Sequence, residues 1–140
     1  MKRAIELRPL SREHHHALVL ARRVEREAAR ADADLVALWR DACHALETSL
    51  DPHFVIEERH LLTPLAARGE RALVERTRSD HDRLRALMTN GPVGEPLRDR
   101  LRAFAALLPE HVRFEEAVLF PLAEARLSPT QLAEVLAAHA

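Results

Sequence analysis

A short polar pattern occurs twice in this chain: residues 53–58 read His-Phe-Val-Ile-Glu-Glu, and residues 111–116 read His-Val-Arg-Phe-Glu-Glu. In each copy a histidine precedes a glutamate by four residues, so on an α-helix both side chains point from one face, one turn apart. Leucines such as Leu50 and Leu108 share that face, which places both pairs inside the protein. A bare carboxylate in an apolar core costs several kcal/mol unless it is paired or binds a metal. The repeated pattern therefore indicates metal binding.

Helix-favouring residues dominate the rest of the sequence, and β-branched residues never alternate as they would in strands. We expect four long helices over residues 11–30, 34–68, 70–89 and 97–126, and a short amphipathic helix that opens at Ser128-Pro129. Long helices with short connections indicate an all-α, up-down-up-down four-helix bundle with a short C-terminal helix. The length of 140 residues predicts a single domain over residues 1–140.

Individual residues predict where these helices begin and end. Ser11 is expected as the N-cap of the first helix and Asp34 as that of the second. Gly69 is expected to end the second helix in the left-handed conformation. Residues 90–96, Asn-Gly-Pro-Val-Gly-Glu-Pro, are expected to form a loop.

Two prolines fall inside the predicted helices. Pro52 and Pro109 each remove a backbone hydrogen bond, and we expect a kink at each. Asp51-Pro52 is also compatible with a cap and a fresh start, so the second helix is expected as either one bent piece or two.

The position of each histidine relative to the apolar face of its helix also indicates inward histidines in the first and third helices. At about 100° per residue, His14 lies roughly 50° from the centre of the apolar face of the first helix. His15 stays an alternative, because the first turn after Ser11 need not follow ideal geometry. In the third helix His81 shares a face with Leu84 and also points inward.

Six side chains are thus expected to point into the bundle, one histidine from each helix and two glutamates: His14, His53, Glu57, His81, His111 and Glu115. Imidazole and carboxylate suit first-row transition metals but do not select among iron, manganese and zinc. Six ligands are enough for two metal ions that share bridging carboxylates and keep open coordination positions.

The distances of these residues from the turns between helices place most of the six at the same level in the bundle. His14 and His53 lie about equally far from a turn near residue 33, so at about 1.5 Å per residue they are level in adjacent helices. The last hairpin fits less well, because His81 is about 11 residues before a turn near residue 92 and His111 about 19 after it, a mismatch of about 12 Å. The loop or an overhanging start of the fourth helix must absorb that difference.

Several residues beside the six candidate ligands are expected to support the site. Glu58, Glu110 and Glu116 lie toward the edge of the inward faces, where they either support the ligands or are solvated; whether Glu58 or Glu116 ligates stays open. Phe54 and Phe114 are expected to wall the site.

A ferritin-like arrangement is the rival plan. Glu13–His16 and Glu57–His60 have the Glu-x-x-His spacing of that class. His16 points away from the apolar face, however, and the plan leaves most of the inward histidines without roles. We expect His16, His60 and His139 at the surface or its boundary.

Composition excludes several classes of function. With 21 Lys and Arg against 22 Asp and Glu, the net charge is −1, which offers no field to gather nucleic acid. The longest apolar run, residues 17–21, is far too short for a membrane span, and residues 1–10 lack a secretory core. The lone Cys43 cannot form an internal disulfide, so we expect a cytoplasmic protein.

At these residues the chain resembles the hemerythrin family in its broad bacterial HHE cation-binding form, over roughly residues 10–126. The resemblance rests on the Leu-Ser-Arg-Glu-His-His opening at residues 10–15, the two His-x-x-x-Glu-Glu units and Asp80-His81. It implies a centre of two non-haem iron ions, with manganese or zinc as substitutes. By the same resemblance Glu57 and Glu115 would bridge the ions and the four histidines would be terminal ligands.

The chain departs from the oxygen-carrying members of that family. Those carry two histidines four residues apart on the third helix, whereas Thr77 and Arg85 flank His81 here. They also carry an aspartate five residues after the fourth-helix histidine, where this chain has Glu116. A missing histidine leaves more open coordination, which favours binding or sensing of O2 or NO, reaction with peroxide, or iron handling over simple oxygen carriage.

Two questions stay open from the sequence. The first is whether the chain is an enzyme, with weak peroxidase or ferroxidase activity, or only a binding protein. The second is an alternative of another class: a regulatory bundle with a structural metal site, whose C-terminal helix contacts a protein partner.

Overall fold

The computed structural model describes residues 2–89 and 96–139, and within these residues the chain forms helices and turns with no β-strand. The elements follow in this order: the 3-10 helix η1 (Ile5–Leu7), α1 (Arg8–Ala28), α2 (Leu35–Ala45), η2 (Leu46–Leu50), α3 (Asp51–Glu57), η3 (Glu58–Leu62), α4 (Thr63–Ala67), α5 (Arg71–Thr89), α6 (Leu97–Phe114), η4 (Glu115–Leu119), α7 (Phe120–Arg126) and α8 (Pro129–Ala137). The elements η2, η3 and η4 are π-helical turns.

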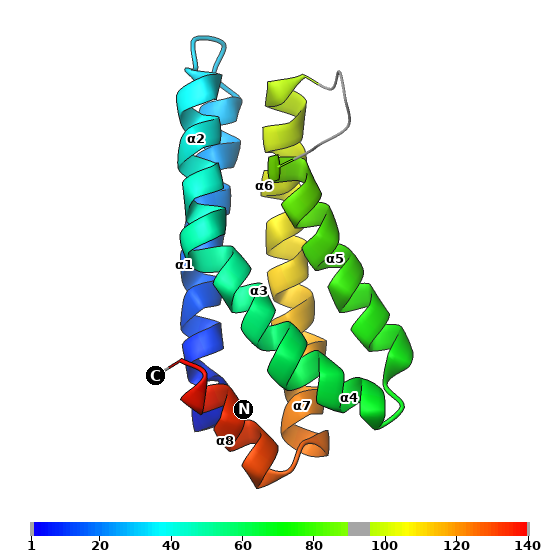
Figure 1. Cartoon of the computed structure of the whole chain (residues 1–140). Helices are drawn as coiled ribbons and strands as arrows, with labels where there is room; N and C mark the ends of the chain where they lie inside the picture. The colour runs from blue at the N-terminus through cyan, green and yellow to red at the C-terminus, as the bar shows by residue number, and fades with distance from the viewer. Residues whose placement is uncertain (1, 90–95, 140) are drawn as a thin grey trace.

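These elements build the predicted all-α bundle of four long helices that alternate in direction (Figure 1). The first is α1, the second runs from α2 to α4, the third is α5, and the fourth runs from α6 to α7. The short helix α8 lies across one end of the bundle, where it contacts η1 and η3. Within the described residues, none of the helices combines the length and apolar character that a membrane span requires.

Three of the predicted helix ends are confirmed. The side chain of Asp34 caps α2 by accepting the backbone N–H of Ala37 at 3.1 Å. Gly69 follows α4 with φ +92°, the left-handed conformation that a glycine adopts without strain. Ser128 caps α8, and its backbone N–H is bonded in return by the Gln131 side chain. Residues 90–95 of the predicted loop lie outside the described residues.

The predicted start of the first helix is wrong by one turn. Helix α1 begins at Arg8, with Pro9 in its first turn. A proline there costs no hydrogen bond, because the first N–H groups of a helix have no partner within the helix. Ser11 is therefore inside the helix and is not its N-cap. Its hydroxyl instead donates to Oε2 of Glu116 at 2.9 Å.

A wide π-helical turn precedes three of the prolines. The residues before Pro52, Pro64 and Pro121 donate their backbone N–H groups to carbonyls five residues earlier, at Leu46, Glu58 and Glu115. A proline ring clashes with the carbonyl four residues before it, and a wider turn relieves that clash. The second helix consequently stays one continuous but bent piece, and it changes direction between α2 and α3 (Figure 1).

An overhanging helix absorbs the depth mismatch of the last hairpin. The first turns of α6 stand beyond the end of α5 (Figure 1) and reach the end of α1. There the Arg98 guanidinium donates to the backbone carbonyls of Ala28 and Arg30. His81 and His111 are thereby brought level, with ring centroids 4.8 Å apart.

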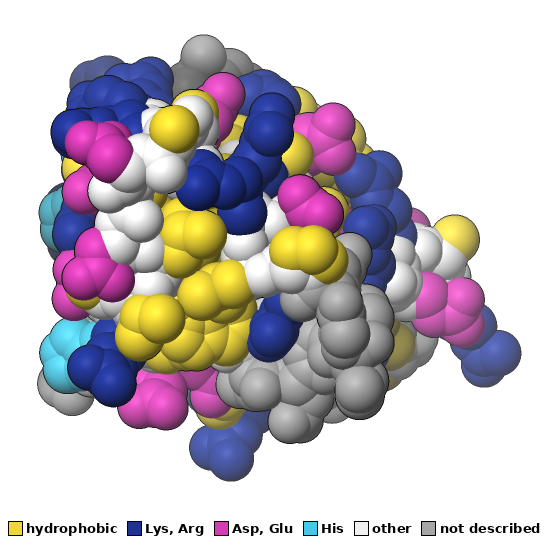
Figure 2. Space-filling model, turned by 90° about the horizontal axis from the view of Figure 1, so that it is seen from above, with side chains coloured by type: hydrophobic (Ala, Val, Ile, Leu, Met, Phe, Trp, Pro, Cys, Tyr) yellow, Lys and Arg dark blue, Asp and Glu magenta, His cyan; other side chains and the backbone are white. Residues whose placement is uncertain are grey.

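The apolar core consists of two clusters separated along the bundle. One contains Phe54, Leu84 and Phe104 and lies between the helices on the side of the α1–α2 turn. The other contains Leu65, Phe120 and Val135 and includes the inner face of α8. On the face at the end with the α1–α2 turn, acidic and basic side chains lie beside one another around an apolar patch (Figure 2).

Candidate metal centre

A layer of buried histidine and glutamate side chains separates the two apolar clusters. The structure brings together all six residues that the sequence selected, and each is at most 3% exposed: His14, His53, Glu57, His81, His111 and Glu115. The histidines come from α1, α3, α5 and α6, while Glu57 ends α3 and Glu115 begins η4. The two wide turns of η3 and η4 thus lie directly at the two carboxylates.

These side chains form two overlapping groups, in each of which the ligand atoms lie within 4.8 Å of one another. His14 and His53 belong to one group and His81 and His111 to the other. Glu57 and Glu115 belong to both. Of the two candidates on α1, His14 is buried in this layer and His15 is exposed. His16 of the ferritin-like plan is exposed as well.

Each glutamate turns one oxygen toward each histidine pair. Oε2 of Glu57 lies 3.0 Å from Nε2 of His53, while its Oε1 lies 3.1 Å from Nε2 of His81. Oε1 of Glu115 lies 2.8 Å from Nε2 of His14, while its Oε2 lies 3.3 Å from Nε2 of His111. Two carboxylates placed in this way can each contact two neighbouring cations.

Most inward atoms of the layer lack hydrogen bonds, although Nε2 of His14 and Oε1 of Glu115 are bonded to each other. Among the described residues, both oxygens of Glu57, Oε2 of Glu115 and Nε2 of His53, His81 and His111 are buried without a hydrogen-bond partner. Buried polar atoms in proteins nearly always have one, so each exception needs a cause. Apart from Nε of Arg3, these exceptions lie together in the layer and are atoms that can bind a metal, so this donor set fits a pair of metal ions.

A carboxylate from a neighbouring helix holds the outer nitrogen of every histidine. Nδ1 of His14 lies 2.6 Å from Glu116, and Nδ1 of His81 lies 2.8 Å from Glu58. These two glutamates therefore contact the histidines from outside, as their place at the edge of the inward faces suggested.

Two further carboxylates act in the same way, and sequence reasoning gave them no such role. Nδ1 of His53 lies 2.8 Å from Glu13, and Nδ1 of His111 lies 3.1 Å from Asp80. The available signal was their position, because each precedes the inward histidine of its own helix. Every one of the four helices contributes one histidine and one outer carboxylate, which closes a ring around the bundle.

This ring fixes the histidines for metal binding. An Nδ1–H that donates to a carboxylate leaves the lone pair of a neutral imidazole on Nε2, and it also sets the orientation of the ring. In all four histidines Nδ1 faces the outer carboxylate and Nε2 faces the shared glutamates.

Two phenylalanines close the layer above and below. Phe54 stacks on His81 with ring centroids 4.1 Å apart and meets His53 and His111 edge-on. Phe120 stacks on His14 at 5.1 Å. The wall predicted from Phe114 is supplied by Phe120 instead, because Phe114 is half-buried and lies beneath the guanidinium of Arg76.

A family model described as the hemerythrin HHE cation binding domain matches residues 6–123. The chain belongs to the hemerythrin HHE cation-binding family. Searches of curated proteins and of solved structures returned no match. The matched region contains the entire histidine–glutamate layer of this hemerythrin-like chain and ends before α8.

Without a metal, the charges of this hemerythrin-like layer balance through protons. Burial alone would lower the pKa of His53, but the carboxylates of Glu57 and Glu13 raise it to about 9. The pKa of His81 is raised to about 11 against the same burial penalty by its contacts with Glu115, Glu57 and Glu58. Burial alone would raise the pKa of Glu57, yet the neighbouring imidazolium groups hold it well below its usual range.

Metal uptake is therefore expected to release protons. His53 and His81, with pKa values raised to about 9 and about 11, are charged at neutral pH, and the pKa values of His14 and His111 are raised as well, whereas a metal ligand must be neutral. We therefore expect release of at least two protons, from His53 and His81, when metal is taken up at pH 7, and a metal affinity that increases with pH. Titration of metal-free protein with zinc in weakly buffered solution with a pH indicator measures this number. Uptake of zinc without proton release would contradict the expectation, and His15→Ala should release as many protons as the unaltered protein.

Proposed function

We propose that this hemerythrin-like protein binds two non-haem iron ions and, through them, a small ligand such as O2, NO or peroxide. His14 and His53 would hold one ion, and His81 and His111 the other. Glu57 and Glu115 would bridge the two. Bound iron would supply redox chemistry toward the small ligand, which the protein side chains themselves lack.

The shared glutamates are the observation that carries this proposal. Each has one oxygen beside each histidine pair, at distances of 2.8 to 3.3 Å for the closest contacts. A site for a single ion would need neither the second pair nor the divided oxygens. A pair of iron ions matches these donors, and manganese or zinc would use the same residues.

Room for a small ligand follows from the number of donors. Each group supplies four ligand atoms, counting one per residue, whereas iron commonly takes more. The stacked rings of Phe54 and Phe120 keep the layer away from bulk water, and the outer carboxylates keep the histidine rings from turning. These residues would hold the iron in place while its remaining positions meet the ligand.

Two broader expectations remain part of the proposal. The free Cys43 agrees with a cytoplasmic protein, in a compartment that keeps thiols reduced. The assignment of residues 1–140 to one domain also stays a prediction.

The deciding experiment is metal content followed by ligand addition. Reconstitution with ferrous iron under anaerobic conditions, followed by removal of the excess, should leave about two iron ions per chain. The optical spectrum should then change on addition of NO, azide or O2. A content near zero would contradict the di-iron proposal.

A structural metal site is the alternative from another class. Such a site would retain its metal and show the same spectrum before and after each ligand is added. Multiple turnovers of hydrogen peroxide would instead show that the protein is an enzyme.

A further inference from the structure

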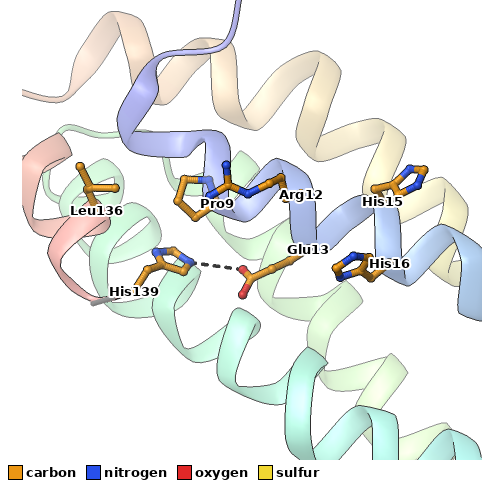
Figure 3. A pocket seen from close by; sticks show the side chains of 7 residues that line it. All are labelled: Pro9, Arg12, Glu13, His15, His16, Leu136 and His139. Atoms are coloured by element: carbon orange, nitrogen blue, oxygen red, sulfur yellow. Dashed lines mark hydrogen bonds and ion pairs between the residues drawn. The ribbon is translucent and has the colours of Figure 1, made fainter.

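Two successive contacts connect the end of the C-terminal helix with the histidine–glutamate layer. Nε2 of His139, just after α8, lies 3.2 Å from Oε1 of Glu13 (Figure 3). The same oxygen lies 2.8 Å from Nδ1 of His53. His139 and His53 thus contact the same carboxylate oxygen of Glu13.

The other three outer carboxylates each have an arginine in the corresponding place. Glu58 accepts from Arg85 at 2.8 Å. Asp80 lies 3.6 Å from Arg76, and Glu116 lies 3.4 Å from Arg3. Every outer carboxylate therefore has a positively charged or hydrogen-bonding side chain behind it, and at Glu13 that side chain is His139.

Glu13 is the most exposed of the four outer carboxylates. Its side chain is 39% exposed, compared with 33% for Glu116, 19% for Glu58 and 10% for Asp80. It also lines an open surface pocket of about 750 Å³, together with His139 (Figure 3). An exposed carboxylate with water available can turn away from a buried histidine unless a second group holds it.

His139 is itself held firmly enough to do so. The capping box of Ser128 and Gln131 fixes the start of α8, and Val135 is fully buried in the second apolar cluster. The His139 ring lies 3.0 Å from the Val135 carbonyl through Nδ1, which leaves Nε2 directed at Glu13.

We propose that His139 is a positioning residue of the metal centre: it holds Glu13, and Glu13 holds His53 with Nε2 directed inward. The inference rests on the proposed function in one respect, namely that a metal ion is what Nε2 of His53 is directed toward. The matched family region ends at residue 123, before α8, so this contact is not part of the family match.

Metal-free protein provides the first test. Nitrogen-15 spectra of the histidine rings report the hydrogen bond at each nitrogen. His139→Ala should shift the His53 ring signals while those of His81 and His111, on the far pair, stay unchanged. His139→Gln, which keeps a donor near Glu13, should restore the His53 signals. His15→Ala is the matched control, because His15 lines the same pocket but points away from Glu13 (Figure 3).

Metal affinity provides the second test. Loss of an outer partner commonly weakens metal binding by 10–100-fold, and because His139 acts one step further out we expect about 10-fold weaker binding of one of the two ions in His139→Ala. His139→Gln should recover most of this loss, and His15→Ala should have no effect.

Two results would overturn the inference: His53 ring signals that His139→Ala leaves unchanged, or a His139→Gln variant as impaired as His139→Ala. The second result would mean that the imidazole of His139 serves only to dock α8 on the bundle. Failure of the unaltered protein to take up any metal would remove the proposed function, yet the ring spectra would still decide whether His139 orients His53.

Discussion

Replacing Glu115 with alanine is expected to remove both metal ions from the protein. Glu115 belongs to both donor groups, so in the proposed site its loss would take one ligand from each ion and one of the two bridges between them. Metal analysis after anaerobic reconstitution should fall from about two ions per chain to near zero. A variant that kept its full metal load would show that Glu115 is not a ligand.

The metal-free Glu115→Ala protein should also be less stable. Oε1 of Glu115 lies 2.8 Å from His14, and its Oε2 lies within 3.5 Å of both His81 and His111. Removing one partner of a buried ion pair commonly costs about 3–5 kcal/mol in the free energy of unfolding. Part of that cost will be relieved, because histidines without the carboxylate can lose their protons.

Two variants separate loss of ligation from loss of folding. Glu115→Gln keeps the size of the side chain but not its charge, so it should fold with native helix content and still bind metal weakly. Glu110→Ala makes the same change on an exposed side chain of α6, directly before His111 and five residues before Glu115, and should keep about two ions. Equal metal loss in Glu110→Ala would indicate that the assay reports helix damage.

The sequence predicted the inward residues because helical periodicity relates each histidine and glutamate to its own helix. His53 and Glu57 share a face with leucines, and that face is buried whatever the neighbouring helix does. The caps at Asp34 and Ser128 were equally local, since each depends on residues within one turn. Such features need no knowledge of how the helices are placed in space.

Contacts between helices were beyond this reasoning. Glu13 and Asp80 each precede an inward histidine in the sequence, but each bonds the histidine of a different helix. Their role depends on the rotation of the helices around the bundle, which periodicity within one helix does not give. His139 reaches Glu13 from 126 residues away, through a helix whose docking no local pattern predicts.

Helix geometry explains the remaining differences. A proline follows each His-x-x-x-Glu-Glu unit, with Pro64 six residues after Glu58 and Pro121 five residues after Glu116. The structure shows a π-helical turn before each of these prolines, starting at Glu58 in one unit and at Glu115 in the other. An ideal 3.6-residue period cannot anticipate such turns, and it also cannot set the overhang of α6 beyond α5.

Phe54→Ala should give a large loss of stability while leaving all six proposed ligands in place. Phe54 is fully buried and packs on His81 with ring centroids 4.1 Å apart. Removing a buried phenylalanine ring typically costs about 3–5 kcal/mol, through lost apolar burial and the cavity that remains. Urea unfolding of the metal-free variant measures this, since bound metal would add its own stabilisation to both proteins.

Phe114→Ala is the matched comparison, because Phe114 is half-buried and its ring lies beneath Arg76, outside the ligand layer. We expect its cost to be well below that of Phe54→Ala, because less apolar surface leaves water in the native state at this position. The cavity left by Phe54 opens beside His53, His81 and His111, so metal should also dissociate faster from this variant than from Phe114→Ala. Equal losses of stability in the two variants would mean that Phe54 is not the apolar wall of the layer, and that the polar contacts around the histidines maintain the layer by themselves.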